Sequence, residues 1–203
     1  MEFLLVRHGE SYSNTDRVFS NTGWKHGLTA RGLQQAEEAS KALPGFFGQF
    51  TRVYSSPLRR AYETAEVMAL DNGVEHRVLA ELAEISVGQL EGRSDPDSWL
   101  IHNAVWNRWF RLGDTEARLP EGESLKQAVE RFVCALSRLE EEEAGSKLVI
   151  VSHGGVMLGL LQGAVYDVPD FISRRGFISN CDMIRIVKEK GSYIYKGFKS
   201  IIP

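Results

Sequence analysis

Two histidines, His8 and His153, stand directly behind short apolar runs of the sequence. Phe3–Val6 precedes Arg7 and His8, and Leu148–Val151 precedes the segment that carries His153. Such a run, followed by a polar turn with glycine, is typical of a buried strand that presents side chains at its carboxyl end. In open α/β sheets, ligands bind at that edge. The sequence therefore predicts that the two histidines meet at one edge of a sheet.

The residue types around these histidines suit the transfer of a phosphoryl group without a metal ion. A phosphate monoester is dianionic, and its uncatalysed hydrolysis needs up to ~10²¹-fold acceleration. The guanidinium groups of Arg7 and Arg60 can grip two oxygens each and meet the charge of the transition state. His8 beside these arginines is expected to stay neutral and nucleophilic. Departure of the alkoxide then needs a proton, which a carboxyl group can give.

A series of motifs runs along most of the chain. In order they are Arg7–Glu10, Leu28–Gly32, Ser55–Ala61, Leu82–Ile85, Glu121–Ser124 and Ser152–Gly155. Together they resemble the motifs of the histidine phosphatase superfamily, also called the phosphoglycerate mutase-like family. Any one of these motifs can occur by chance, whereas their shared order is specific.

The resemblance implies a role for each residue of the expected site. His8 matches the histidine that is transiently phosphorylated. Arg7, Arg60 and His153 match the side chains that surround the phosphate. Glu84 matches the glutamate that gives and takes protons as general acid and base.

Two further positions are expected to bind the substrate, namely Asn14, six residues after the nucleophile, and Gly154. Glu81 is the competing candidate for the role given to Glu84. No cluster of His, Cys, Asp or Glu has metal-ligand spacing, so we expect no metal and no other cofactor. The histidines that match no motif, and that are expected to be structural or exposed, are His26, His76 and His102.

Three functions fit the motifs, and hydrolysis of small phosphomonoesters is favoured. Mutases of the family carry Asn where this chain has Gly155, and they hold a bisphosphate with a lysine-bearing segment and an arginine pair. Here Gly88–Arg93, which follows Glu84, contains no lysine, and Arg108 and Arg111 do not match that pair. A cofactor-dependent phosphoglycerate mutase is therefore the alternative. A non-catalytic module that binds phosphorylated ligands is the third function, and the filled catalytic positions disfavour it.

The substrate is expected to be a small phosphorylated metabolite. Trp99, Trp106 and Trp109 recur at helical spacing. They could stack on the organic part of the substrate or pack against the sheet, and packing is favoured. Phe19 and Trp24, in the loop after the nucleophile, are candidates for the entrance of the site.

Strand and helix signals alternate along residues 1–203 and predict one domain, an α/β/α sandwich with a mainly parallel sheet. Strands are expected at 3–6, 52–54, 76–79, 147–151, 183–187 and 193–195. Helices are expected to begin after Thr29, Ser56, Asp95 and Ser124, and another runs from about Gly155 to Gly163. The glycines four apart on that last helix, including Gly159, are expected to pack against the sheet rather than form a dimer contact.

Composition sets the remaining expectations. The formal net charge is −3 and no basic run occurs, so we expect no nucleic-acid partner. No apolar stretch reaches the roughly 18 residues of a membrane span, and the first strand begins too early to leave room for a secretory signal. Cys134 and Cys181 lack disulfide or zinc spacing, which indicates free thiols in a cytoplasmic protein. We expect a monomer or a homodimer.

Overall fold

A mixed sheet organises the molecule in the computed structural model, which describes residues 1–173 and 176–201. Within these residues, seven strands pair in the order β3-β2-β4-β1-β6-β7-β5. Their bounds are β1 Glu2–Arg7, β2 Arg52–Ser55, β3 Glu75–Val78, β4 Lys147–Ser152, β5 Val165–Tyr166, β6 Met183–Glu189 and β7 Ser192–Lys199. The neighbours β3, β2, β4 and β1 run parallel, and β5 runs parallel to β7. Strand β6 is antiparallel to both β1 and β7.

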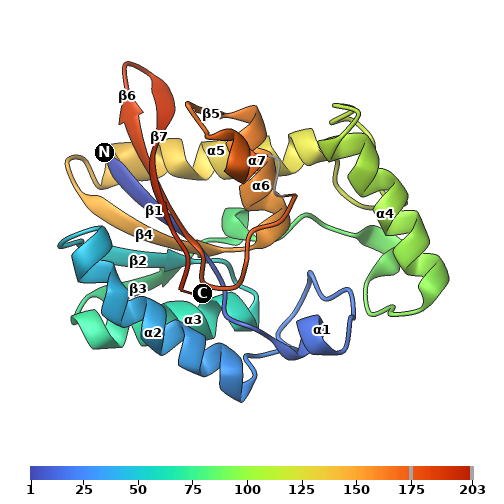
Figure 1. Cartoon of the computed structure of the whole chain (residues 1–203), viewed down its shortest axis with the longest axis horizontal. Helices are drawn as coiled ribbons and strands as arrows, with labels where there is room; N and C mark the ends of the chain where they lie inside the picture. The colour runs from blue at the N-terminus through green and yellow to red at the C-terminus, as the bar shows by residue number, and fades with distance from the viewer. Residues whose placement is uncertain (174–175, 202–203) are drawn as a thin grey trace.

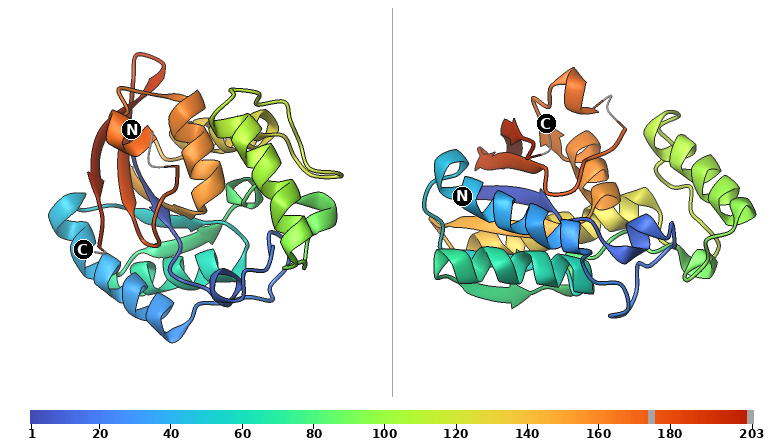
Figure 2. Two further views of the ribbon diagram at one scale, coloured as in Figure 1. Left: turned by 45° about the vertical axis from the view of Figure 1, so that its right-hand side comes forward. Right: turned by 60° about the horizontal axis from the view of Figure 1, so that its bottom comes forward.

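Helices cover both faces of this sheet (Figure 1). On one face lie α2 at Ala30–Phe46 and α3 at Arg59–Asn72, and on the other lie α5 at Leu125–Glu142 and α6 at Gly154–Gly163. The prediction of an α/β fold with a mainly parallel sheet between two helical layers is confirmed. Figure 2 shows α4, at Pro96–Phe110, standing outside these layers. The short elements are α1 Tyr12–Thr15, α7 Asp170–Ser173 and the 3₁₀ turns Ala80–Leu82 and Gly88–Leu90.

The alternation of side chains along β1 explains why both faces need a helical layer. Leu4 and Val6 belong to the apolar cluster under α2 and α3, whereas Phe3 and Leu5 belong to the cluster under α5 and α6. All four side chains are fully buried. Because successive residues of a strand point to opposite faces, one strand with no polar side chain at these positions requires cover on both.

Three of the expected helix starts are confirmed by their caps. Thr29 accepts a hydrogen bond from the backbone of Gly32 at 3.0 Å, and Asp95 accepts one from the backbone of Ser98 at 3.0 Å. Ser124 and the side chain three residues later form the expected capping box.

The expected start of α3 after Ser56 is wrong. This helix begins at Arg59, and its N-cap is Leu58. Pro57 is compatible both with extended backbone before the helix and with its first turn. The pair Ser56 and Pro57 therefore does not define where the helix starts. The hydroxyl of Ser56 accepts the N–H of Leu58 instead.

The glycines of α6 face a different partner from the one predicted. A Cβ on Gly159 would stand 2.5 Å from a terminal methyl carbon of Leu125 and 3.0 Å from one of Val129. These side chains belong to α5, so the missing side chain lets two helices of the same layer approach each other. Packing between helices replaces the predicted packing against the sheet.

Two expectations from composition can be compared with the described residues. No helix within residues 1–173 and 176–201 is both long and apolar enough to cross a membrane. Cys134 is exposed and Cys181 is buried, and both are free.

Candidate active site

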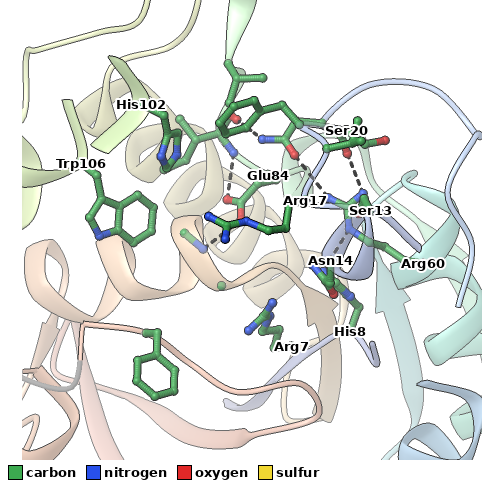
Figure 3. A pocket seen from close by; sticks show the side chains of 18 of the residues that line it. Arg7, His8, Ser13, Asn14, Arg17, Ser20, Arg60, Glu84, His102 and Trp106 are labelled. Atoms are coloured by element: carbon green, nitrogen blue, oxygen red, sulfur yellow. Dashed lines mark hydrogen bonds between the residues drawn. The ribbon is translucent and has the colours of Figure 1, made fainter. Parts of the chain in front are cut away.

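A cleft of about 350 Å³ opens at the carboxyl edge of the parallel strands, between the sheet and α4. Its lining includes the predicted site residues Arg7, His8, Asn14, Arg60, Glu84 and Gly154. Figure 3 shows the side chains of Arg7, His8, Asn14, Arg60 and Glu84 converging from separate elements. The structure therefore brings together residues that lie up to 147 positions apart in the sequence, from Arg7 to Gly154. Their individual catalytic roles remain predictions.

The His8 ring is buried and held in a single tautomer. Its Nδ1 lies 2.6 Å from the carbonyl oxygen of Gly9, which can only accept, so Nδ1 carries the proton. Nε2 accepts a hydrogen bond from Nε of Arg60 at 3.0 Å. Burial lowers the pKa of His8 well below its ordinary value, and the charges of Arg60 and Arg7 lower it further. Nε2 is therefore an unprotonated nitrogen whose lone pair accepts the Arg60 N–H.

Close backbone contacts fix the loop that carries this histidine. A Cβ on Gly9 would lie 2.4 Å from the carbonyl oxygen of Gly32, and one on Gly32 would lie 1.9 Å from that of Glu10. The backbone N–H of Gly9 donates to the hydroxyl of Thr64 at 3.1 Å. The Leu28–Gly32 motif thus serves as a backbone support for the nucleophile loop.

Two buried arginines supply positive charge beside His8. Nη1 of Arg60 donates to the carbonyl of Ser20 at 2.6 Å, and burial lowers the pKa of Arg60 to about 10, so it stays charged at neutral pH. Nη1 of Arg7 donates to the carbonyl of Ile178 at 2.5 Å. Within the described residues, the buried Nε of Arg7 has no hydrogen-bond partner.

Gly154 lies directly against that buried Nε of Arg7. A Cβ at position 154 would stand 3.3 Å from it, a distance that forces one of the two groups to shift. Gly154 therefore leaves room for the Arg7 side chain at the lining of the cleft, and its substrate-binding role stays a prediction.

His153, the N-cap of α6, lies with its ring centroid 5.0 Å from that of His8. Its Nε2 lies 2.7 Å from Oγ of Ser56. The same hydroxyl also accepts the backbone N–H of Leu58 at 3.2 Å. In the part of the chain that the structure describes, the buried Nδ1 of His153 has no partner. Burial and the charge of Arg60 lower the pKa of His153 well below its ordinary value, so the ring is neutral.

The Glu84 carboxylate sits on the first turn of α6. Its Oε2 accepts the N–H of Gly155 at 2.9 Å, and its Oε1 accepts those of Val156 and Ile85 at 2.8 and 2.9 Å. Unpaired N–H groups at a helix start favour a negative group at this place. The competitor Glu81 forms an ion pair with Arg138 and does not belong to the cleft lining among the described residues.

Comparison with known proteins decides the family. The model of the histidine phosphatase superfamily (branch 1) matches residues 3–199. The chain belongs to the histidine phosphatase superfamily. It is 31% identical over 198 residues to the probable phosphoglycerate mutase GpmB of Salmonella arizonae, which covers 98% of this chain and 90% of the relative. The predicted family and the prediction of an enzyme of the histidine phosphatase class are both confirmed.

Solved structures show the same fold. The α-ribazole phosphatase of Shigella flexneri superimposes with a TM-score of 0.76 at 26% identity, covering 98% of this chain and 96% of its own. A mycobacterial glucosyl-3-phosphoglycerate phosphatase gives 0.81 at 22% identity, covering 96% of both chains. These likenesses cover almost the whole of the described sheet and its helices.

Relative to the superfamily motifs, sequence reasoning missed several side chains that complete the site. Ser56 bonds to His153, and the side-chain N–H of Asn180 donates to the carbonyl of His8 at 3.0 Å. Asn14 lies beside them, since its Oδ1 is 3.4 Å from the same Asn180 nitrogen. No spacing signal identifies Asn180, because it reaches the nucleophile loop from a segment at the other end of the sequence.

The structure adds a contact with the cleft to the expectations for His102 and the aromatic residues. His102 was expected to be structural or exposed, but it lines the cleft beside Trp99 and Trp106. Packing was favoured for the tryptophans of α4, and they do pack, yet the same face forms a wall of the cleft. Phe19 also lines the cleft as expected, whereas Trp24 lies outside the lining among the described residues.

Proposed function

We propose that this member of the superfamily is a metal-independent phosphatase that hydrolyses small phosphomonoesters through a phosphohistidine on His8. One observation carries the proposal. A neutral His8 lies among two arginines and His153, and the buried Nε of Arg7 and Nδ1 of His153 lack partners in the described structure. Buried polar atoms without partners are costly. In the proposal a dianionic phosphate accepts from both atoms, with the ring proton of His153 on Nδ1.

The first half of the reaction transfers the phosphoryl group to the protein. Phosphate oxygens replace Nε2 of His8 as the acceptor of the Arg60 N–H, which frees the lone pair. Nε2 then attacks phosphorus, and the bond from phosphorus to the ester oxygen breaks. Glu84 enters this step in its protonated form and gives its proton to that oxygen, so that an alcohol leaves and a carboxylate remains. Arg7, Arg60 and His153 stabilise the charge on the three oxygens that do not react.

The second half returns the enzyme to its starting state. The Glu84 carboxylate takes a proton from water as the water oxygen attacks phosphorus. The bond from phosphorus to Nε2 breaks, its electron pair returns to His8, and inorganic phosphate leaves. Each half uses the same carboxyl group in opposite directions, so one glutamate suffices.

Phosphoglycerate mutase activity is the second candidate, because the curated relatives are named probable phosphoglycerate mutases. The geometry favours hydrolysis. No lysine belongs to the cleft lining among the described residues, and Arg108 pairs with Asp114 on the surface. The free cysteines support the cytoplasmic location that we include in the proposal.

The test measures phosphate release from a panel of phosphomonoesters in EDTA, for the wild type, His8→Gln and the control His26→Gln. The panel includes both monophosphoglycerates and 2,3-bisphosphoglycerate. We expect release that survives EDTA and the control substitution, and that falls at least about 1,000-fold in His8→Gln. Release from no compound, or release that needs an added metal, contradicts the proposal. Interconversion of the monophosphoglycerates that outpaces phosphate release favours the mutase.

A further inference from the structure

The cleft beyond the phosphate-binding residues has an aromatic wall. It is formed by Phe19 and by side chains on one face of α4, namely Trp99, His102, Trp106 and Trp109. The ring centroids of Phe19 and Trp99 are 4.3 Å apart, and those of His102 and Trp106 are 5.5 Å apart. The rings therefore form a continuous surface that leads away from His8. Figure 3 shows His102 and Trp106 on the side of the cleft opposite Arg60.

This wall is held in place by contacts behind it. The indole N–H of Trp99 donates to the carbonyl of Arg17 at 2.9 Å, and that of Trp109 donates to the carbonyl of Ala117 at 2.6 Å. The guanidinium of Arg17 lies 5.2 Å from the centre of the Trp99 ring. Because these two indole N–H groups are satisfied by backbone, the rings of Trp99 and Trp109 need no polar partner from a ligand.

Phe19 and Trp109 anchor the wall in the core, with only 6% and 3% of their surface exposed. The rest of the wall is only partly buried. Trp99, His102 and Trp106 keep part of their surface exposed. Phe177, which precedes β6 and also lines the cleft, is 55% exposed. Large aromatic surface that stays open to water inside a cleft gains free energy when a flat apolar group covers it.

We propose that the alcohol released from the substrate carries a flat aromatic ring, as in a nucleotide-like 5′-phosphomonoester, and that this ring stacks on the wall of α4. The proposal rests on the proposed function, because it assigns the leaving group of the same site. The phosphate is held at the carboxyl edge of the sheet by Arg7 and Arg60, and the ring extends along α4 past His102 to Trp106.

A matched pair of substrates isolates the ring. Ribose 5-phosphate and adenosine 5′-monophosphate share the ester oxygen and the sugar, so the chemical step is the same and only the base differs. We expect kcat/KM for the adenosine ester to be at least about tenfold higher, the size of one stacking contact. Equal values, or a preference for an acidic ester such as 3-phosphoglycerate, overturn the proposal, and the second result would assign Arg17 to a carboxylate.

Variants tie that preference to the wall. In Trp106→Leu we expect the ratio of the two kcat/KM values to fall to below about threefold. Phe177→Ala should also lower the ratio, and its exposed side chain makes the variant a safe second choice if Trp106→Leu folds poorly. Trp24→Leu is the control, since Trp24 contacts Tyr62 with ring centroids 5.0 Å apart, outside the cleft lining of the described residues. An unchanged ratio in both cleft variants contradicts the proposal.

A binding experiment separates this proposal from the proposed function. The chain has four tryptophans, and Trp24→Phe leaves only the three on α4. In this variant we expect adenosine 5′-monophosphate to quench tryptophan fluorescence and ribose 5-phosphate to leave it unchanged. Absence of quenching overturns the aromatic site even if both esters are hydrolysed. Quenching without hydrolysis of either ester supports the aromatic site and contradicts the phosphatase.

Discussion

At the scale of single residues, the position of one proton decides whether the site can work. His8 donates from Nδ1 to the carbonyl of Gly9, so Nε2 is the nitrogen that can attack. In the unliganded site the N–H of Arg60 donates to Nε2. This contact disfavours protonation of the ring, because two positive charges would then face each other. The arginine therefore keeps the nucleophile neutral and later binds the phosphate.

The first prediction concerns the titration of His8. Burial, Arg60 and Arg7 all lower its pKa well below 6.5, so the ring stays neutral as the pH falls through that value. Titration of the ring followed by NMR, with His8→Gln to assign the signal, should show no midpoint near pH 6.5. A midpoint at or above pH 6.5 contradicts the described environment.

At this scale the sequence identified the residues that motifs carry and missed those that only the fold brings near. The sequence separation of Arg7 and Arg60 does not indicate how close they lie in space. Two motifs nevertheless identified both as site residues. Ser56 and Asn180 were missed as site residues because their partners lie 97 and 172 residues away and are defined by loops. Hydrogen bonds between distant loops follow no local periodicity.

At the scale of elements, the first turn of α6 holds the Glu84 carboxylate. A Cβ on Gly155 would lie 2.8 Å from Oε1 of Glu84, so a glycine is needed for this contact. On the same helix, a Cβ on Gly163 would meet only Val129, at an ordinary 3.8 Å. The two glycines form a matched pair for substitution.

The second prediction uses that pair. Gly155→Ala should displace the Glu84 carboxylate and lower kcat by about 100-fold, the cost of a misplacement near 1 Å. Gly163→Ala should leave kcat unchanged and raise stability by up to about 1 kcal/mol, because alanine favours a helix. Steady-state kinetics and thermal unfolding measure both. Equal activity of the two variants would show that catalysis does not depend on the contact between Glu84 and the first turn of α6.

Arg131 of α5 fastens the loop that carries Glu84. Its Nη1 donates to the carbonyls of Glu81 and Ala83 at 2.5 and 3.2 Å, and its Nη2 lies 3.5 Å from that of Glu84. It also forms an ion pair with Glu123 at 2.9 Å. One side chain thus fixes the backbone that leads up to the proposed general acid and the carbonyl of Glu84 itself.

The third prediction tests this positioning role. Arg131→Met should lower kcat about tenfold or more while KM changes little, because proton transfer suffers and phosphate binding does not. Arg138→Met is the control, since Arg138 lies on the same helix and its ion pair with Glu81 is exposed. A rise in KM without a fall in kcat would contradict the positioning role.

Helices were largely predictable where the hydrophobic periodicity and the N-cap residue indicated the same start. The helix at Leu125–Glu142 has both a capping box and an apolar face, and its bounds match closely. The two-residue strand β5 and the one-turn helices α1 and α7 were not predicted, because segments this short carry no period.

At the scale of the whole molecule, burying two neutral histidines makes stability depend on pH. The pKa values of His8 and His153 lie well below 6.5 in the folded chain. In the unfolded chain they return to about 6.5. As the pH falls through that range, these two histidines take up protons only in the unfolded chain. Their contribution to the free energy of unfolding is therefore fully present above pH 6.5 and is lost as the pH falls below it.

The fourth prediction gives the size of this loss. Each of the two histidines should contribute a slope of about 1.4 kcal/mol per pH unit below pH 6.5, down to its folded pKa. Urea unfolding of the wild type and His153→Gln between about pH 7.5 and 5.5 measures it, and the variant should show the smaller slope. Identical slopes contradict a buried, neutral His153.

The architecture followed from alternation of strand and helix signals, but the placement of α4 did not. Its aromatic period predicted a helix and left open what its face meets. That face both packs and lines the cleft, because α4 stands beyond the sheet edge rather than on a sheet face (Figure 2). Helical periodicity in the sequence indicates that one face of a helix is apolar. It does not indicate which cavity that face borders, because this depends on the fold.

The most direct test of the central claim is to trap the phosphoenzyme. The wild type and His8→Gln are mixed with a ³²P-labelled phosphomonoester in EDTA, quenched in alkali within the first turnover, and digested to peptides. We expect acid-labile, alkali-stable label on the peptide that contains His8, and no label in the variant. Turnover without any labelled wild-type peptide, or label that persists in His8→Gln, would contradict it.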